Sequence, residues 1–421
     1  MGVGSLRRAS LRSLYTARPL EPVPAESFRR DVRVISVVGV AHAISHVLQL
    51  TLPPLFPLLR AEFDVSWTLL GTLVGVFYLA SAGTQFAAGF LVDRYGARPV
   101  LLGGMALAVV GTVLTALAPG AYWLFPCTAL VGAGNGVFHP ADFAILNASV
   151  APRRLGHAYS THGVGGNLGY AIAPIVSFGL GSAFGWRIAV AVVGLAALLA
   201  FLFVWSQRTH LDAHRASPAT HDVVRGSVRL FLQPAILLCF TFFALQTAAG
   251  VGLQTFLPAG LDGALGLPLA IGTTAVTAYL LGGVAGIVAG GFIAAGTRRH
   301  DRVAAAGLFS GAVLLMIVTG GLLPSALAVG GLAGVGFLIG AIGPSRDLIV
   351  RAAAPREASG RVYGFVYSGL DLGGTLGPVV FGVMLDHGLA RGLFFVIAGL
   401  YLVAIATVVN ARRSTVLPAA A

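Results

Sequence analysis

Charged side chains are scarce in this sequence, because Asp, Glu, Lys and Arg together make up 10% of its 421 residues. A soluble domain carries about 25% charged residues, since its surface faces water. Lys is absent altogether, so every basic chain of this class is Arg. The two cysteines, Cys127 and Cys239, lie in apolar segments and lack the number and spacing of a disulfide framework or metal site. A large soluble enzyme is excluded, and we expect no metal and no cofactor.

Apolar residues make up 57% of the chain, and its mean hydropathy is +0.87. A membrane-spanning helix needs about 20 mostly apolar residues. The 57 glycines are typical of helices that pack closely in lipid. We therefore predict an all-α membrane protein with twelve transmembrane helices, at residues 34–58, 68–92, 99–118, 121–148, 161–184, 187–206, 231–258, 270–296, 303–321, 324–350, 361–384 and 392–411.

The arginines are unevenly divided among the predicted loops. A net charge of +12 can indicate nucleic-acid binding, but these arginines lie between apolar segments. The N-terminal tail, alternate loops and the C-terminus carry most of them, while the opposite loops hold only Arg60, Arg187 and Arg391. Because basic loops stay in the cytoplasm, this bias predicts cytoplasmic N- and C-termini and an even number of spans. We expect no nucleic-acid partner.

An internal repeat divides the chain into halves. Tyr159-Ser160 followed by Gly165-Gly166 in the fifth span recurs as Tyr367-Ser368 followed by Gly373-Gly374 in the eleventh. A repeat unit with an even number of spans keeps its orientation, so two parallel six-helix bundles are expected. The predicted organisation is a disordered Arg-rich cytoplasmic tail at 1–30, bundles at 31–206 and 231–411, a cytoplasmic linker at 207–230 and a tail at 412–421.

The loop after the second span, Gly89 to Arg98, reads G-F-L-V-D-R-Y-G-A-R. It resembles the signature loop of the major facilitator superfamily, G-x-x-x-D-R-x-G-x-R. Residues 134–140 and 165–169 are similar to the fosmidomycin-resistance-type exporter branch. The C-terminal copy of the loop, residues 291–299, lacks the Asp. The resemblance implies two bundles that expose a central cavity to one side of the membrane at a time.

The same resemblance implies a gating role for this loop. Asp93 would accept hydrogen bonds from a neighbouring helix N-terminus, where the helix dipole is positive. Arg94 and Arg98 would pair with cytoplasmic carboxylates, and Asp142 is expected within their reach. The alternative for this loop is a solvated turn in which Arg94 and Arg98 only anchor the helix ends at the cytoplasmic side of the membrane. The predicted gating residues are Gly89, Asp93, Arg94, Gly96, Arg98 and Asp142.

Polar residues inside the spans are costly in lipid and usually line a cavity. In the first span, His42, His46 and Gln49 share one helical face, and Pro53, Pro54 and Pro57 should break its outer end. A single buried His is more often a hydrogen-bonded packing residue than a ligand. The predicted cavity residues are His42, His46, Gln49, Tyr78, Gln85, Asn135, His139, His162, Asn167, Gln246, Gln254, Tyr279 and Tyr367.

Asp371 is the carboxylate deepest within a predicted span. We expect it, with His46 and His162, to couple protonation to solute binding, because His titrates near neutral pH. The alternative for Asp371 is a structural hydrogen bond to a neighbouring helix. Arg346 and Asp347, near the inner end of the tenth span, are expected to form a charge pair in the second half.

These features predict a secondary active transporter in the cell inner membrane. No nucleotide-binding loop is present, so the energy must come from an ion gradient or from the solute itself. We expect a monomer that binds a small-molecule solute and protons, with proton-coupled efflux of a drug or metabolite. The alternative is proton-coupled uptake of a small organic anion. A membrane enzyme using His139, His162 and Asp142 as metal ligands, or a sensor, lacks motif support.

Overall fold

The computed structural model describes residues 25–211, 230–353 and 359–416, and within these ranges every regular element is a helix. Most of the predicted tail at 1–30 and of the linker at 207–230, and the chain end beyond 416, fall outside them. Helix α1 (Ala25–Gln49) begins inside the predicted tail. Asp31 of this helix accepts hydrogen bonds from Arg154 Nε at 2.6 Å and Ala151 N at 3.1 Å. These contacts fix the first turns of α1 against the following helices.

Eleven stretches of the described chain are long and apolar enough to cross a membrane. The first, Phe28–Phe63, combines α1 with the short η1 (Pro53–Leu55) and α2 (Phe56–Phe63), so the prolines break the first span as predicted. The other helices that form these stretches are α3 (Trp67–Tyr95), α4 (Ala97–Ala116), α7 (Leu155–Phe184), α8 (Trp186–Ser206), α10 (Pro234–Leu265), α11 (Leu269–Ala295), α12 (His300–Thr319), α13 (Ala328–Ala341), α14 (Gly343–Ala353), α15 (Ser359–Asp386) and α16 (Ala390–Val416).

The predicted fourth span, 121–148, is divided. It forms α5 (Leu124–Asn135) and α6 (Phe138–Ser149), which are joined by a turn at Gly136 and Val137. Pro140 lies in the first turn of α6, where a missing N–H costs little, whereas it would break the hydrogen-bond ladder of one continuous helix. Neither piece alone is long enough to count as a span, which explains the difference between eleven and the predicted twelve.

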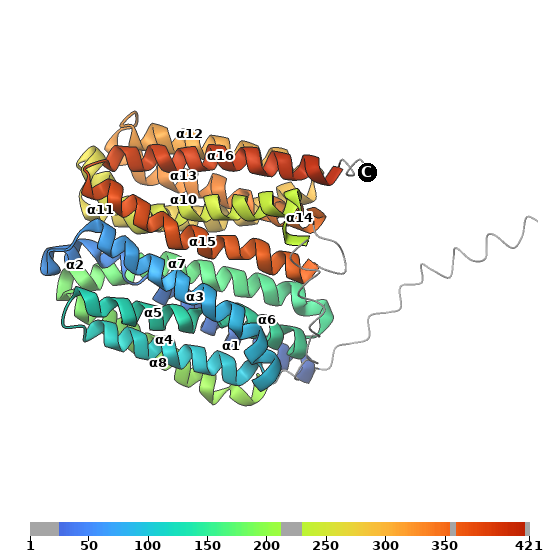
Figure 1. Ribbon diagram of the computed structural model, residues 1–421. Coiled ribbons are helices and arrows are strands. Elements are labelled where there is room, and N and C mark those ends of the chain that lie inside the picture. Colours follow the sequence, from blue (N-terminus) through green and yellow to red (C-terminus); the bar gives the residue numbers. More distant parts are fainter. Residues whose placement is uncertain (1–24, 212–229, 354–358, 417–421) are drawn as a thin grey trace, which may run out of the picture.

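Helices α1–α8 occupy the lower part of Figure 1 and α10–α16 the upper part. Most contacts between these groups are made by two helix pairs, α3 with α15 and α7 with α11, and η1 also contacts α10. Along α3, a carbon added at Gly71 would lie 2.2 Å from Pro378 O, and one at Gly75 would lie 2.7 Å from Thr375 O. The backbones of α3 and α15 therefore touch near the end that holds Trp67, called here the Trp67 end.

The same two helices are apart at the other end of the molecule, called here the Asp93 end. Gly89 lies on the same face of α3 as Gly71, about five turns further along at 3.6 residues per turn. A carbon added at Gly89 would meet nothing within 4 Å, and the same holds at Gly364 on α15. Phe90 is 68% exposed. The two helix groups are therefore closed against each other at the Trp67 end and separated at the Asp93 end.

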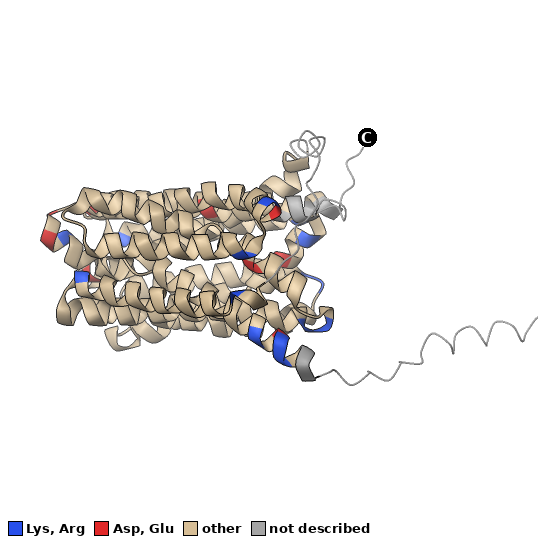
Figure 2. Ribbon diagram, turned by 90° about the horizontal axis from the view of Figure 1, so that it is seen from below, with Lys and Arg blue, Asp and Glu red and all other residues tan. Residues whose placement is uncertain are grey.

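The charged residues gather near the two ends of the helices (Figure 2). At the Trp67 end, Glu62 accepts hydrogen bonds from Arg187 and, at 2.6 Å, from Trp186 Nε1. At the Asp93 end, Arg412 pairs with Asp301. The long apolar middle and the charged ends are the distribution that a bilayer imposes.

Close helix contacts in the C-terminal group rest on glycine. A carbon added at Gly336 of α13 would lie 1.9 Å from Tyr279 O of α11, so no larger residue fits without separating the helices. Gly330 of the same helix faces open space. Small residues at such contacts let backbones pack tightly in lipid.

We predict that Gly336→Leu destabilises the protein by about 1–3 kcal/mol or more, because overpacking forces α11 and α13 apart. The temperature at which the purified protein loses its monodisperse gel-filtration peak should fall clearly. Gly330→Leu is the matched control on α13 and should leave this temperature unchanged. Equal temperatures for the two variants would contradict the packing argument.

Candidate functional site

Imidazole rings from three helices meet inside the N-terminal group. His42 and His46 come from α1, His139 from α6 and His162 from α7. The rings of His42 and His162 are stacked with centroids 3.5 Å apart, while those of His46 and His139 lie 4.4 Å and 5.3 Å from His42. The four predicted histidines therefore form one cluster.

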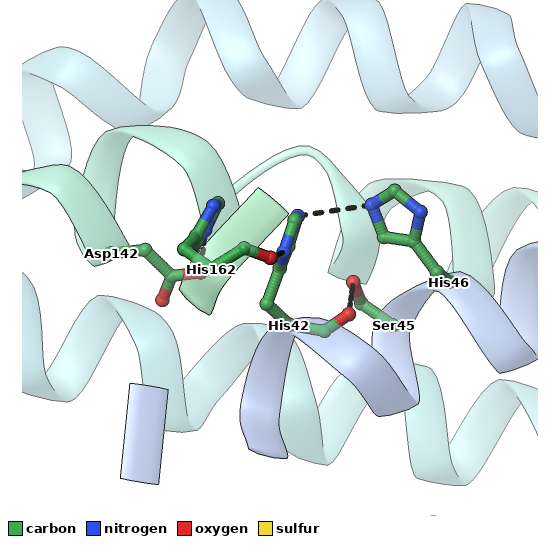
Figure 3. A network of polar contacts seen from close by, with 5 residues as sticks. All are labelled: His42, Ser45, His46, Asp142 and His162. Carbon is green, nitrogen blue, oxygen red and sulfur yellow. Dashed lines mark hydrogen bonds and ion pairs between the residues drawn. The ribbon is translucent and has the colours of Figure 1, made fainter. Parts of the chain in front are cut away.

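The cluster is joined by hydrogen bonds, and Figure 3 shows His42 and His162 between Asp142 and His46. His162 Nε2 lies 3.1 Å from Asp142 Oδ2, and His42 Nδ1 lies 2.8 Å from the His162 carbonyl oxygen. Since a carbonyl oxygen only accepts, His42 Nδ1 carries the proton. In a neutral His42 the other nitrogen then accepts from His46 Nε2–H, at 3.0 Å.

Glycines of α7 create the space for these rings. A carbon added at Gly166 would lie 2.7 Å from His42 Cε1 and 3.1 Å from His46 Cε1. A carbon added at Gly169 would lie 2.3 Å from Ala43 O, so α7 packs directly on the α1 backbone there. The glycine-rich segment 165–169 is therefore required by the close approach of the two helices that carry the histidines.

A second set of polar contacts leads from the cluster to the junction of the helix groups. The His46 ring lies 4.1 Å from the Tyr170 ring. Gln49 Nε2 donates to the Tyr78 hydroxyl at 2.7 Å. Tyr78 also packs on Gly374 of α15, since a carbon added there would lie 2.5 Å from its ring. The histidine cluster thus connects through α3 to the other group.

Asp371 of α15 lies at this junction. Gln85 Nε2 of α3 donates to Asp371 Oδ2 at 3.5 Å, a long hydrogen bond that links the two helix groups. Asp371 is half-buried. Among the described residues, the bond from Gln85 is the one hydrogen bond of the Asp371 carboxylate, a weak pairing for a charged group within a membrane-spanning helix.

Three buried polar atoms of predicted site residues lack a hydrogen-bond partner within the described part of the chain: His46 Nδ1, Asp142 Oδ1 and Gln246 Oε1. Buried polar atoms are nearly always paired with protein groups, water or a ligand. In the neutral tautomer derived above, His46 Nδ1 is an acceptor. All three atoms are therefore acceptors available to a proton, a water molecule or a solute donor.

The remaining predicted cavity residues make other contacts. Asn135 Oδ1 accepts from Ser81 at 3.2 Å, Asn167 donates to Gly163 O of its own helix, and Gln254 is half-buried. Tyr279 is packed in the apolar core of the C-terminal group, and Tyr367 donates to Asp347 Oδ1 at 3.2 Å. Tyr279 and Tyr367 lie apart from the histidine cluster, because helical position alone does not distinguish a cavity face from a packed one.

The predicted pairing of Asp142 with Arg94 or Arg98 needs correction. Asp142 is fully buried, and its described partner is His162. Arg94 lies over the Tyr95 ring at 5.3 Å. The loop sequence gave no sign that His162 of α7 would lie beside Asp142 of α6. The expected charge pair in the second half is present, with Arg346 Nε 3.0 Å from Asp347 Oδ1.

The rest of the gating loop lies at the separated end. Gly96 ends α3 with φ +89°, and its N–H donates to Val92 O at 2.8 Å. Asp93 is half-buried and has no hydrogen bond or ion pair within the described residues.

Sequence reasoning missed the pair of Asp31 with Arg154 and the contacts of Asp386, described below, because no local motif marks either.

A pocket lies within the N-terminal group rather than between the groups. Gln49 is on its wall, together with apolar residues and four threonines whose hydroxyls donate to the backbone carbonyl four residues earlier, Thr51, Thr112, Thr115 and Thr128. The pocket reaches Gln49 but not the histidine rings. It therefore lies next to the histidine cluster, inside the N-terminal group.

Comparison with known proteins identifies the family. The sequence model of the Major Facilitator Superfamily matches residues 38–364 and 253–419. The chain is 27% identical over 372 residues to the fosmidomycin resistance protein of Escherichia coli K12, covering 85% of this chain and 88% of that one. It is 26% identical to the hexuronate transporter of Bacillus subtilis, covering 92% and 96%.

Two further comparisons agree. The probable sulfoacetate transporter SauU of Cupriavidus necator is 25% identical, covering 87% of this chain and 90% of that one. A solved bacterial homolog of the human lysosomal transporter Spinster, in an inward-facing and unoccupied conformation, superposes with a TM-score of 0.75 at 17% identity, covering 92% and 98%. From the matched residues and this shared fold, the chain belongs to the Major Facilitator Superfamily of multi-span membrane transporters and is not an enzyme.

Proposed function

We propose that this protein is a secondary active transporter that moves a small solute across the inner membrane by alternating access, coupled to protons. The observation that carries the proposal is the polar connection from the histidine cluster to Asp371 across the junction of the helix groups. Three predicted site residues also carry an acceptor without a partner among the described residues, namely His46 Nδ1, Asp142 Oδ1 and Gln246 Oε1. A solute bound at this junction would contact both groups and so respond to their relative movement.

The proposed topology has twelve crossings in two six-helix bundles, at 31–206 and 231–411. Helices α5 and α6 together form the fourth crossing, because 12 and 12 residues at 1.5 Å per residue extend about 36 Å, enough for a hydrocarbon core of about 30 Å. Arg60, Arg187 and Arg391 lie towards the Trp67 end. The excess of arginine at the Asp93 end supports a cytoplasmic location for that end and for both termini.

With this topology the described conformation is open to the cytoplasm. Contacts of Gly71 and Gly75 with α15 close the outer side, while Gly89 and Gly364 face open space on the inner side. Asp93 would engage the N-terminus of α15 when the inner side closes, as expected for the gating loop. The protein then presents the site to one side at a time.

Proton coupling is proposed for Asp371 with His46 and His162. A buried carboxylate is tolerated in lipid when it is neutral or paired. Protonation of Asp371 would remove its negative charge from the junction. A solute that binds there would therefore change the balance between the protonated and the ionised carboxyl group. His46 and His162 are the proposed carriers for the proton, because each imidazole ring has one nitrogen that donates and one that accepts.

Export of a drug or metabolite is the proposed direction. The names of similar proteins include a fosmidomycin resistance protein and, over 41% of this chain, a multidrug resistance protein B homolog of Mycobacterium tuberculosis. Uptake of a small organic anion is the second candidate. The cluster of four imidazoles favours it, as do the similar hexuronate and sulfoacetate transporters.

We predict that proteoliposomes in which the protein faces one way will move fosmidomycin against its gradient in exchange for protons. A pH gradient should drive this flux, and collapse of the gradient with a protonophore should abolish it. Glucuronate is the matched probe for the second candidate. Entry of glucuronate together with protons would replace antiport by symport, and no proton-dependent flux of either probe would contradict the coupling.

Asp371→Asn should reduce gradient-driven flux by about tenfold or more, because an amide cannot gain or lose the proton that the carboxylate exchanges. Solute exchange at equal pH on both sides should persist, since it needs binding and movement but no net proton transfer. Asp64→Asn, at an exposed position in the turn after α2, is the control. Normal coupling in Asp371→Asn would remove Asp371 from the mechanism.

His46→Ala removes the ring that donates to His42 and packs on Tyr170. We predict a rise of about fivefold or more in the solute concentration for half-maximal flux, or a comparable loss of coupling, from the loss of about 1 kcal/mol per hydrogen bond. His157→Ala, an exposed His of α7, is the matched control. Transport that is unchanged in both variants would show that the cluster is structural.

A further inference from the structure

Asp386, the last residue of α15, binds the beginning of α3 in the other helix group. Its carboxylate accepts from Trp67 N at 2.7 Å, Thr68 N at 2.8 Å and Thr68 Oγ1 at 2.5 Å. The first N–H groups of a helix have no partner within that helix. Asp386 therefore supplies acceptors that α3 needs, across the junction that alternating access must open.

The remaining donors of this helix end are satisfied locally. Ser66 Oγ accepts from Leu69 N at 3.1 Å, and Ser66 O lies 3.3 Å from Leu70 N. The N–H groups of Trp67 and Thr68 are the two that depend on Asp386. A negative charge at a helix N-terminus is also favoured by the helix dipole. If α15 moved away, the hydrogen bonds between these two N–H groups and the Asp386 carboxylate would break, and the groups would be exposed to water.

Gly382, one helical turn before Asp386 on α15, allows this contact. A carbon added at Gly382 would lie 2.5 Å from Trp67 O and 2.8 Å from Thr68 Cα. The helix then ends in a turn at Gly388, which has φ +72°. Gly382 and Asp386 thus form a G-x-x-x-D pattern at the C-terminal end of α15, closed by a glycine with positive φ.

The same pattern closes α3 at the opposite end of the molecule. Gly89 and Asp93 have identical spacing, and Gly96 follows with φ +89°. The contacts of Gly71 with Pro378, Gly75 with Thr375 and Gln85 with Asp371 show that the two helices run antiparallel. Continued along the helices, this register brings Asp93 opposite the first turns of α15, where Gly364 faces open space.

We propose that Asp386 is the outer latch of the transporter, and that Asp386 and Asp93 act as reciprocal caps. Each aspartate ends one helix of the α3–α15 pair and caps the N-terminus of the other, one on each side of the membrane. The Asp386 cap holds the outer side closed in the described conformation. It must break before Asp93 reaches α15, so the two caps exclude each other and balance the two conformations. This inference rests on the proposed alternating access.

The test measures how far the α3–α15 contact opens at its outer end. Val379 lies in this contact, because its Cγ2 would be 3.4 Å from a carbon added at Gly75. Val379→Cys is introduced after Cys127 and Cys239 are replaced by Ser. The labelling rate of Cys at position 379 by a bulky maleimide is then measured on purified, monodisperse protein in detergent.

Asp386→Asn should raise this labelling rate by about 3- to 10-fold, because charged hydrogen bonds to the α3 N-terminus are lost. Thr68→Val keeps the side-chain volume, removes one of the three hydrogen bonds and should raise the rate by about twofold. Asp262→Asn, at an exposed Asp near the outer end of α10, is the matched control and should match the parent. The double variant Asp93→Asn with Asp386→Asn should return towards the parent rate.

Parent-like labelling in both Asp386→Asn and Thr68→Val would overturn the latch. Labelling of the double variant equal to that of Asp386→Asn alone would overturn the reciprocal part. A failure of alternating access itself gives a different set of results from a failure of the latch. In that case the Asp93→Asn variant alone would also label at the parent rate. If Asp386→Asn does not fold, Thr68→Val decides the result.

Discussion

The backbone contact between α3 and α15 is the constraint on which the rest of the arrangement depends. Gly71 and Gly75 allow α15 to approach within van der Waals distance, and no side chain larger than hydrogen fits at Gly71. This contact closes the Trp67 end and also places Tyr78 on Gly374 and Gln85 beside Asp371. A helix contact made of backbone and small residues contributes little free energy of association, because lipid is as apolar as most side chains. Polar contacts such as the Asp386 cap can therefore shift its equilibrium.

The cost of polar groups in lipid explains how the site is built. Asp142 is paired with His162, and His42 is held by a carbonyl and by His46, so much of the cluster is satisfied internally. The acceptors left over, including His46 Nδ1 and Gln246 Oε1, are the exception that a binding site requires. A fully satisfied network would be a rigid packing element, whereas acceptors without a protein partner can take part in binding.

Much of the fold could be predicted from the sequence, because apolar length and proline positions act locally. The spans and the break at Pro53 follow from such local rules. The turn at Gly136 was harder to predict, since Pro140 lies within the helix that follows and not at the break itself. The partner of Asp142 depends on where α7, which packs on α1 at Gly166 and Gly169, places His162 relative to α6. Asp386 was missed for the same reason, because capping of α3 by α15 joins segments more than half the chain apart.

The central claim is that the two ends of the junction open in alternation. Its most direct measurement is spin-label distances in lipid nanodiscs, with one label pair at His157 and Arg298 near the Asp93 end and another at Ser182 and Ser325 near the Trp67 end. These four residues are exposed. As pH is changed from acidic to alkaline, the populations should shift so that one distance lengthens while the other shortens. Distances that stay fixed, or that change together in the same direction, would contradict alternating access around this site.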